Sequence, residues 1–319
     1  MTIGEAAGLK LGKATRDAFG AALKELGREF PNLVTVDGDV GNSTRTEVFA
    51  KAFPDRAFNV GIAESNMVGI AGGLAAAGKI PVVSSFAAFL LCNAFDQIRM
   101  SIAYPGMNVK LVGTHAGISI GEDGASQMGI EDIALACSLP GVAVVVPADA
   151  ISAKKATRAM VEHVGPVYLR CGRIEVPEIY NADSPFVIGK ANTLKDGNDV
   201  TIIANGLMVG IALDAAAMLE KTGVQARVID MHTVKPLDQD AIVKAATETG
   251  RIVVTEEHLM SGGLGSAIAT VVARTRPVPM EFVNVGDCYA ESGDPDGLLR
   301  KFGLTAEAII AAVTKVRSR

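Results

Sequence analysis

The chain has 319 residues, of which 49% are hydrophobic and 5% aromatic, and it carries a formal net charge of −5. This length predicts about two domains, and the aliphatic composition indicates a well-buried α/β protein rather than a disordered one. The acidic balance argues against a nucleic-acid or anionic-membrane surface, and no apolar run reaches the roughly 18 residues of a membrane-spanning helix.

The first half of the chain alternates between short β-branched runs and Ala-rich stretches with helical spacing. We expect strands at residues 33–36, 57–60, 82–84, 109–113, 142–146 and 167–170. Helices are expected at residues 15–29, 65–77, 94–103, 130–138 and 150–163. Strands that are apolar throughout and joined by helices predict a parallel, doubly wound sheet that is covered on both faces.

The composition changes between Ile174 and Asn198, where prolines, glycines and polar turn residues signal a domain boundary. A second series follows, with strands at residues 200–204, 226–230, 252–256 and 280–285, and helices at 208–221, 238–249, 263–273 and 306–316. We therefore divide the chain into an α/β domain over residues 1–180 and a smaller α/β domain over 181–319, which we expect to be mainly structural. The Gly262–Gly265 segment lacks GxGxxG spacing, so we interpret it as a capped loop-to-helix junction.

The N-terminal segment and the cysteines indicate the compartment. Charged residues are spread along the N-terminal segment, so it has no apolar run typical of a signal peptide. The four cysteines lie mostly in apolar runs without CxxC spacing, which predicts reduced, buried thiols in a cytoplasmic protein. These are Cys92, Cys137, Cys171 and Cys288.

The most informative segment is a polar, glycine-punctuated loop at residues 115–131, which carries His115, Asp123 and Gln127. Glycines at such spacing let the backbone turn sharply and approach a ligand closely. These features predict a surface loop and leave open whether it is functional.

The residue order of this loop resembles the substrate loop of transketolases, thiamine-diphosphate enzymes that move two-carbon ketol units between sugars. Its Ser-Gln-Met after Glu-Asp-Gly is similar to the variant of vertebrate-type transketolases. Other segments occur in the family's order and at nearly its spacing, and together they cover essentially the whole chain as the second half of a transketolase. They are residues 37–44, 61–67, 86–89, 94–99, 234–238, 255–258 and 302–305.

Three residues are candidates for contact with the cofactor. Glu64 lies among apolar residues, and from context alone it is a helix-start residue whose charge meets the helix dipole. The resemblance implies instead that Glu64 hydrogen-bonds N1′ of the aminopyrimidine ring and so activates thiamine diphosphate. Phe86 and Phe89 would ordinarily be core aromatics, but the resemblance implies that they surround this ring and that Phe89 stacks on it. The segment 90–93 that follows is one residue longer than the family pattern.

Four scattered residues match the transketolase positions that hold the phosphate of a sugar phosphate: Arg16, Ser43, His115 and Arg173. Arginine's planar donor fork suits phosphate, and the hydroxyl and imidazole groups are suited to its remaining acceptors.

Two loop residues match positions near the reacting carbons. Asp123 matches the aspartate that recognises a substrate hydroxyl. Gln127 stands where many microbial transketolases carry a histidine. Glutamine donates a hydrogen bond but cannot exchange protons. We therefore expect residues of a partner chain to carry out proton transfer during the reaction. The histidines at 163, 232 and 258 lack metal-ligand spacing, and we expect them to be structural or at the surface.

The motif that anchors the cofactor's diphosphate through a metal ion is absent, because no Gly-Asp-Gly occurs in the sequence. The resemblance therefore implies that Mg²⁺ (or Ca²⁺) and the diphosphate are bound mainly by a separate N-terminal transketolase subunit. We expect an α2β2 heterotetramer that acts on sugar phosphates, with no metal ligand, nucleic acid or membrane bound by this chain. Small residues after Glu64 suit either close helix packing at this interface or dense core packing.

Two other interpretations stay open. One is a β subunit of a 2-oxoacid dehydrogenase or a deoxyxylulose-phosphate-synthase-like enzyme, which the Ser-Gln-Met loop and the phosphate-site residues disfavour. The other is a non-catalytic regulatory subunit, which the intact Glu64 and Asp123 disfavour. The sequence does not identify the sugar donor or acceptor.

Overall fold

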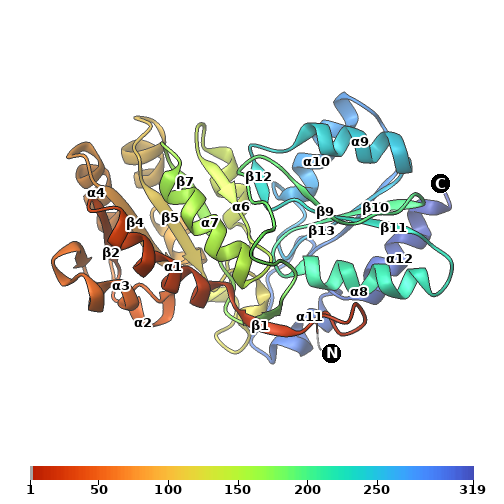
Figure 1. The fold of residues 1–319 in the computed structure, drawn as a ribbon, viewed down its shortest axis with the longest axis horizontal. Coiled ribbons are helices and arrows are strands. Elements are labelled where there is room, and N and C mark those ends of the chain that lie inside the picture. The colour runs from red at the N-terminus through yellow and green to blue at the C-terminus, as the bar shows by residue number, and fades with distance from the viewer. Residues whose placement is uncertain (1–2) are drawn as a thin grey trace.

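The computed structural model describes residues 3–319, which form two α/β halves that lie side by side (Figure 1). The left half in Figure 1 contains a seven-stranded sheet with the order β12-β6-β7-β5-β4-β2-β3. The right half contains a five-stranded sheet with the order β14-β13-β10-β11-β9. The predicted α/β fold with two sheets is therefore confirmed.

The strands of the larger sheet are β2 (Leu33–Asp37), β3 (Ala57–Asn59), β4 (Ile80–Phe86), β5 (Lys110–Thr114), β6 (Ala143–Val145), β7 (Val167–Arg170) and β12 (Thr233–Lys235). The helices of this half are α1 (Thr15–Glu29), α2 (Gly41–Thr44), α3 (Glu47–Ala52), α4 (Glu64–Ala76), α5 (Phe95–Gln97), α6 (Asp132–Ser138) and α7 (Ala150–Glu162). A short antiparallel ribbon joins β1 (Leu11–Ala14) to β8 (Glu175–Pro177).

Helices cover both faces of the larger sheet, which is why its central strands β2, β4, β5 and β7 are buried throughout. On one face α1 packs with α7, and its Phe19, Leu23 and Leu26 are at most 2% exposed. Burial of each such side chain stabilises the fold by about 1.5–3 kcal/mol. On the other face α4 and α6 pack with the π-helical turns that follow β4.

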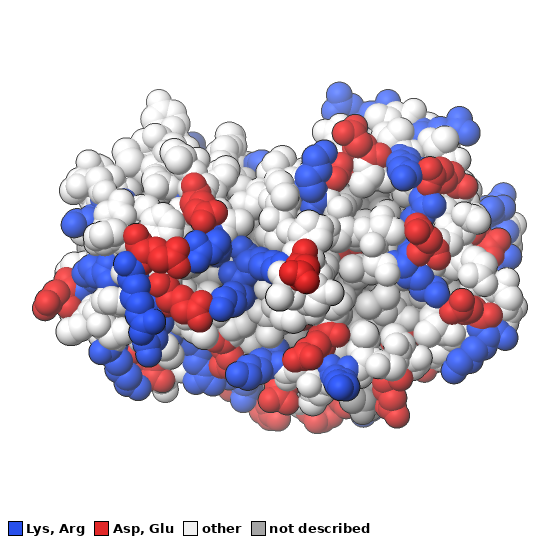
Figure 2. Space-filling view, viewed as in Figure 1, with Lys and Arg blue, Asp and Glu red and all other residues white. Residues whose placement is uncertain are grey.

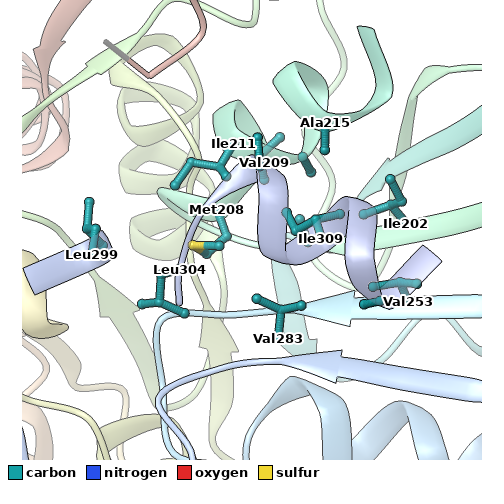
Figure 3. Close-up of a cluster of buried hydrophobic side chains, with 14 of the residues drawn as sticks. Ile202, Met208, Val209, Ile211, Ala215, Val253, Val283, Leu299, Leu304 and Ile309 are labelled. Atoms are coloured by element: carbon teal, nitrogen blue, oxygen red, sulfur yellow. The ribbon is translucent and has the colours of Figure 1, made fainter. Parts of the chain in front are cut away.

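The smaller sheet contains β9 (Asn192–Lys195), β10 (Val200–Ala204), β11 (Ala226–Asp230), β13 (Ile252–Thr255) and β14 (Met280–Val283). Its helices are α8 (Met208–Glu220), α9 (Gln239–Thr249), α10 (Leu264–Arg274), α11 (Pro295–Lys301) and α12 (Ala306–Arg317). Successive strand residues point to opposite faces. Ile202 therefore joins the cluster beneath α8 and α12 (Figure 3), whereas Ile203 joins the cluster beneath α9 and α10.

The two halves share their cores. Strand β12 leaves the second half after β11 and pairs antiparallel with β6, the neighbour of β7 in the first sheet. The hydrophobic cluster beneath α4 and α6 continues into α9 and α10. The division of the chain at residue 180 stays a prediction, and the structure adds that residues 233–235 of the later segment complete the earlier sheet.

Two details differ from the sequence expectations. The helix expected at residues 94–103 is interrupted: residues 89–93 and 98–103 are π-helical, with the short α5 between them. A π turn holds one more residue than an α turn, which gives the extra residue expected at 90–93 a place in the helix. All four cysteines are free, but the expectation of buried thiols is wrong for Cys92 and Cys288, which are exposed. No helix among residues 3–319 is long and apolar enough to cross a membrane.

Candidate active site

The candidate residues gather where neighbouring strands of the larger sheet end. Phe86 ends β4, His115 follows β5, and Arg173 lies three residues beyond β7. Parallel strands bring these carboxyl ends to one edge, where open α/β sheets bind their ligands. Arg16, in the first turn of α1, reaches the same edge because its guanidinium contacts His115.

Glu64 begins α4 and is 6% exposed. Its Oε1 atom accepts a hydrogen bond from Ser85 Oγ at 3.0 Å. Within residues 3–319 no other hydrogen bond reaches this carboxylate, so Oε2 is available to a ligand donor. The helix N-terminus and Ser85 stabilise the buried charge, and the second oxygen remains available for chemistry.

An aromatic stack lies at the same sheet edge, where Phe86 ends β4 directly after Ser85. The ring centroids of Phe86 and Phe89 are 5.4 Å apart and their planes are nearly parallel. The His115 ring stacks on Phe86, with a distance of 3.8 Å between the centroids and an angle of 17° between the planes. Phe86 is buried, whereas Phe89 is only partly buried. Phe89 is therefore the ring of this pair that remains more open to a planar ligand.

His115 is held as a neutral imidazole. Arg16 is always protonated, so its Nη1 donates to His115 Nε2 over 2.7 Å, and Nδ1 must carry the proton that is donated to Thr114 Oγ1 over 2.8 Å. Burial first, and then the charges of Arg16, Arg173 and Arg45, lower the pKa of His115 to about 3. Its φ of 56° is unusual for a non-glycine residue and is typical of functional loops.

Three arginines surround this imidazole. Arg16 Nη1 also donates to the carbonyl oxygen of Ser43 over 3.1 Å, whereas Arg16 Nε is buried without a partner in the described chain. Burial, followed by the charge of Arg45 and more weakly that of Arg173, lowers the pKa of Arg16. Cations crowded in this way, with an unsatisfied donor among them, favour an incoming anion.

Arg45 was not among the residues predicted from the sequence. It ends α2 in a left-handed conformation with φ 69° and pairs with Asp17 of α1. Arg45 could have been predicted as a site residue from its position two residues after Ser43. A solvated surface arginine, however, fits such a turn equally well. The Ser43 contact with Arg16 uses the serine carbonyl rather than its hydroxyl.

Asp123 and Arg173 contact one another. Arg173 Nη1 donates to the carbonyl of Ile120 over 2.6 Å and lies 3.4 Å from Asp123 Oδ2 and 3.6 Å from Glu122 Oε2. These carboxylates are at least one-third exposed, so the pairs are weak and a stronger anion competes with them readily. Gln127 is half-buried and ends the 3₁₀ turn Ala125–Gln127 on the same loop.

The remaining polar residues singled out in the sequence support loops. Asp37 accepts from Val40 N–H and Thr46 Oγ1, which shapes the segment that carries Ser43. In the Gly262–Gly265 junction, the Glu256 carboxylate accepts two N–H groups at the start of α10, as expected for a capped helix. Among residues 3–319 no group of three or more His, Cys, Asp or Glu side chains is arranged to hold a metal ion.

Comparisons with known proteins agree with this arrangement. Residues 12–178 match the transketolase pyrimidine-binding domain, and residues 189–309 match the transketolase C-terminal domain. A solved structure described as a split-gene transketolase in an inactive β4 tetramer is 48% identical, with a TM-score of 0.88 over 96% of this chain and 99% of that one.

Two curated relatives have similar lengths. A 6-deoxy-6-sulfo-D-fructose transketolase subunit from Clostridium sp. is 41% identical and covers 95% of this chain and 94% of its own. One subunit of an apulose-4-phosphate transketolase from Phocaeicola vulgatus is 40% identical and covers 93% of this chain and 95% of its own. The chain therefore belongs to the transketolase family and contains that family's pyrimidine-binding and C-terminal domains.

Proposed function

We propose that this chain is the pyrimidine-side subunit of a thiamine-diphosphate-dependent transketolase. The complete enzyme would transfer a two-carbon ketol unit from a ketose donor to an aldose acceptor, one or both of them phosphorylated. The observation that carries this proposal is the buried Glu64 carboxylate, with one free oxygen, at the sheet edge that also holds an aromatic stack and an arginine cluster.

The residues at this edge fit the pyrimidine end of the cofactor. Glu64 Oε2 would accept a hydrogen bond from a protonated ring nitrogen, and the open face of Phe89 suits a planar ring. Thiamine diphosphate, when bound, supplies the nucleophilic carbon that carries the ketol unit. The role of this chain would be to hold that ring, to bind the sugar and to keep water away from both.

The arginine cluster supports a sugar that ends in an oxyanion. Arg16 has an unsatisfied donor, and Arg45 and Arg173 lie close enough to perturb it. In this proposal the oxyanion displaces Asp123 from Arg173, which frees the Asp123 carboxylate to accept a substrate hydroxyl. Gln127 would donate to a developing oxygen charge. Phosphate and sulfonate both suit the cluster, and the relatives named above act on one sugar of each kind by their descriptions.

The cofactor's diphosphate requires a second chain. This sequence has no Gly-Asp-Gly, so we propose that an N-terminal transketolase subunit holds the diphosphate and Mg²⁺ (or Ca²⁺). The related split-gene protein, described as inactive when it forms a β4 tetramer, supports the idea that such a chain has no activity alone. The assembly would be α2β2.

The exposed face of α4 suits such an interface. Gly72 packs against Ser101 inside the fold, but Gly69 and Gly73 face outward, and a Cβ atom added at either would meet no other atom within 4 Å. Ile62, just before this helix, is 81% exposed. No residue of α4 after Glu64 is charged, whereas charged residues of both signs crowd the other face of this half, where α1 and α7 lie (Figure 2). Small, uncharged residues allow close helix packing.

The proposal is tested by mixing the purified chain with its N-terminal subunit, thiamine diphosphate and Mg²⁺. Ketol transfer is then measured from ketose phosphates and from sulfonated ketoses to aldose-phosphate acceptors. We expect transfer from the mixture and none from either chain alone, and the Glu64→Gln mixture serves as the matched control. Decarboxylation of a 2-oxoacid without ketol transfer would contradict the proposal.

A further inference from the structure

The loop that carries His115, Asp123 and Gln127 belongs partly to the core of the second half. Its Ile118 and Ile120 side chains are completely buried. They lie in the hydrophobic cluster that Figure 3 shows in part, most of whose members come from β10, α8, α11 and α12. Movement of this loop would therefore expose apolar surface of the second half.

One carboxylate of the second half holds the loop backbone. Glu257, two residues beyond β13, is 4% exposed, and its Oε1 accepts the N–H of Ser119 over 2.6 Å. The loop approaches so closely that a Cβ atom at Gly117 would overlap this carboxyl group. Gly117 also has φ +85°, so a glycine is required there on both grounds.

The rest of the loop rests on the segment that leads into α11. A Cβ atom at Gly121 would lie 2.8 Å from Pro295 Cγ, and one at Gly124 would overlap Ser292 Oγ. Both glycines have positive φ. The backbone on either side of Asp123 is thus shaped by contact with the second half.

The C-terminal end of the loop is also hydrogen-bonded to the segment that carries Glu257. Arg170 of β7 donates to the carbonyls of Gly129 and Glu257, both over 2.9 Å, and Leu259 N–H donates to the carbonyl of Ile130 over 3.0 Å. Arg170 is itself held by Asp132. The strand end that carries Glu257 is therefore fixed relative to the loop at two further points.

Glu256 offers a matched comparison. It precedes Glu257 and is equally buried at 1% exposed, but its carboxylate accepts the N–H groups of Leu264 and Gly265 within the second half. Two adjacent buried glutamates thus have separate tasks: one caps a helix of its own domain, and the other reaches across to the substrate loop.

We infer that Glu257 is a positioning residue: it fixes the Gly117–Ser119 backbone and thereby sets where His115, Asp123 and Gln127 stand. The second half, which the sequence predicts to be mainly structural, shapes the sugar site in this way. The inference rests on the proposed function only for what the loop binds; the fixing of the loop is a property of this chain.

The test is hydrogen–deuterium exchange on the purified full chain, read by mass spectrometry. In Glu257→Ala, amides of residues 117–124 should exchange ~10- to 100-fold faster, as expected for loss of a charge-assisted hydrogen bond. Amides of β10 and β13 should keep their wild-type rates. Glu257→Gln keeps an acceptor oxygen and should restore most of the protection, whereas Glu256→Ala should accelerate exchange at α10 and leave residues 117–124 unchanged.

Unchanged loop exchange in Glu257→Ala, or equal acceleration in Glu256→Ala, would overturn the inference. If Glu257→Ala does not fold, Gly117→Ala displaces the loop from the same contact and should raise exchange in the same segment; slow exchange there would equally overturn it. In the reconstituted enzyme, Glu257→Ala should raise the KM for the ketose at least ~10-fold, with rescue by Gln. A wild-type mixture without ketol transfer would refute the proposed function, while the exchange measurements still decide the role of Glu257.

Discussion

Replacing His115 by glutamine should remove a pH dependence of stability that arises from one buried imidazole. Glutamine keeps an acceptor for Arg16 and a donor for Thr114, but it does not titrate between pH 3 and pH 7. In the folded chain the pKa of His115 is lowered to about 3, chiefly by burial and next by Arg16. In the unfolded chain the imidazole returns to its ordinary pKa of about 6.5.

The direction follows from proton uptake. Below about pH 6.5 the unfolded chain binds a proton that the folded chain refuses, so wild-type stability falls as the pH is lowered toward 3. Each pH unit contributes about 1.36 kcal/mol, so lowering the pH from 6.5 to 4 should cost the wild type about 3 kcal/mol through this residue. His115 is only 3% exposed, so solvent screening reduces this value little.

The assay is urea unfolding followed by circular dichroism at pH 7, 6, 5 and 4. The free energy of unfolding of His115→Gln minus that of wild type should increase by about 3 kcal/mol as the pH is lowered from 6.5 to 4, because only the wild type loses this stability. His163→Gln is the control, because His163 is only partly buried and its pKa is lowered less than that of His115. A constant difference between wild type and His115→Gln over this range would refute the neutral, arginine-bound imidazole.

Three further predictions concern the site and the core. Glu64→Gln keeps size and packing but removes the charge, so the reconstituted enzyme should lose at least ~10²-fold in turnover while its unfolding curve changes little. Arg173→Ala should raise the KM for phosphorylated acceptors far more than the KM for glycolaldehyde, and equal effects would show that Arg173 serves structure only. Phe19→Ala should lower the free energy of unfolding by about 3–5 kcal/mol in urea titrations, because the side chain is completely buried between α1 and the sheet; a loss below about 1 kcal/mol would contradict that packing.

Most of the fold follows from local pattern. The expected strand at residues 167–170 coincides with β7, and the expected helix at 15–29 coincides with α1. In each case the spacing of apolar residues in the sequence matches the residues that are buried in the fold. The short β12 was missed, since three residues carry no periodic signal and their pairing with β6 is decided by the packing of the two halves.

The site shows the same division between local and distant causes. The positions of His115 and Phe86 follow from the strand ends that precede them. The Glu257 contact with Ser119 joins residues 138 apart in sequence, and no local pattern contains that information. Arg45 was missed for a related reason, because its effect on His115 depends on how α2 lies against α1.

The central claim, that the cofactor site is shared between two chains, is tested most directly by calorimetric titration of thiamine diphosphate with Mg²⁺. According to the proposed function, this chain supplies the ring site and the N-terminal subunit supplies the diphosphate site, so we expect no measurable magnesium-dependent binding until that subunit is added. After mixing, binding should become tight and should weaken in the Glu64→Gln variant. Tight, magnesium-dependent binding to the chain alone would contradict the claim.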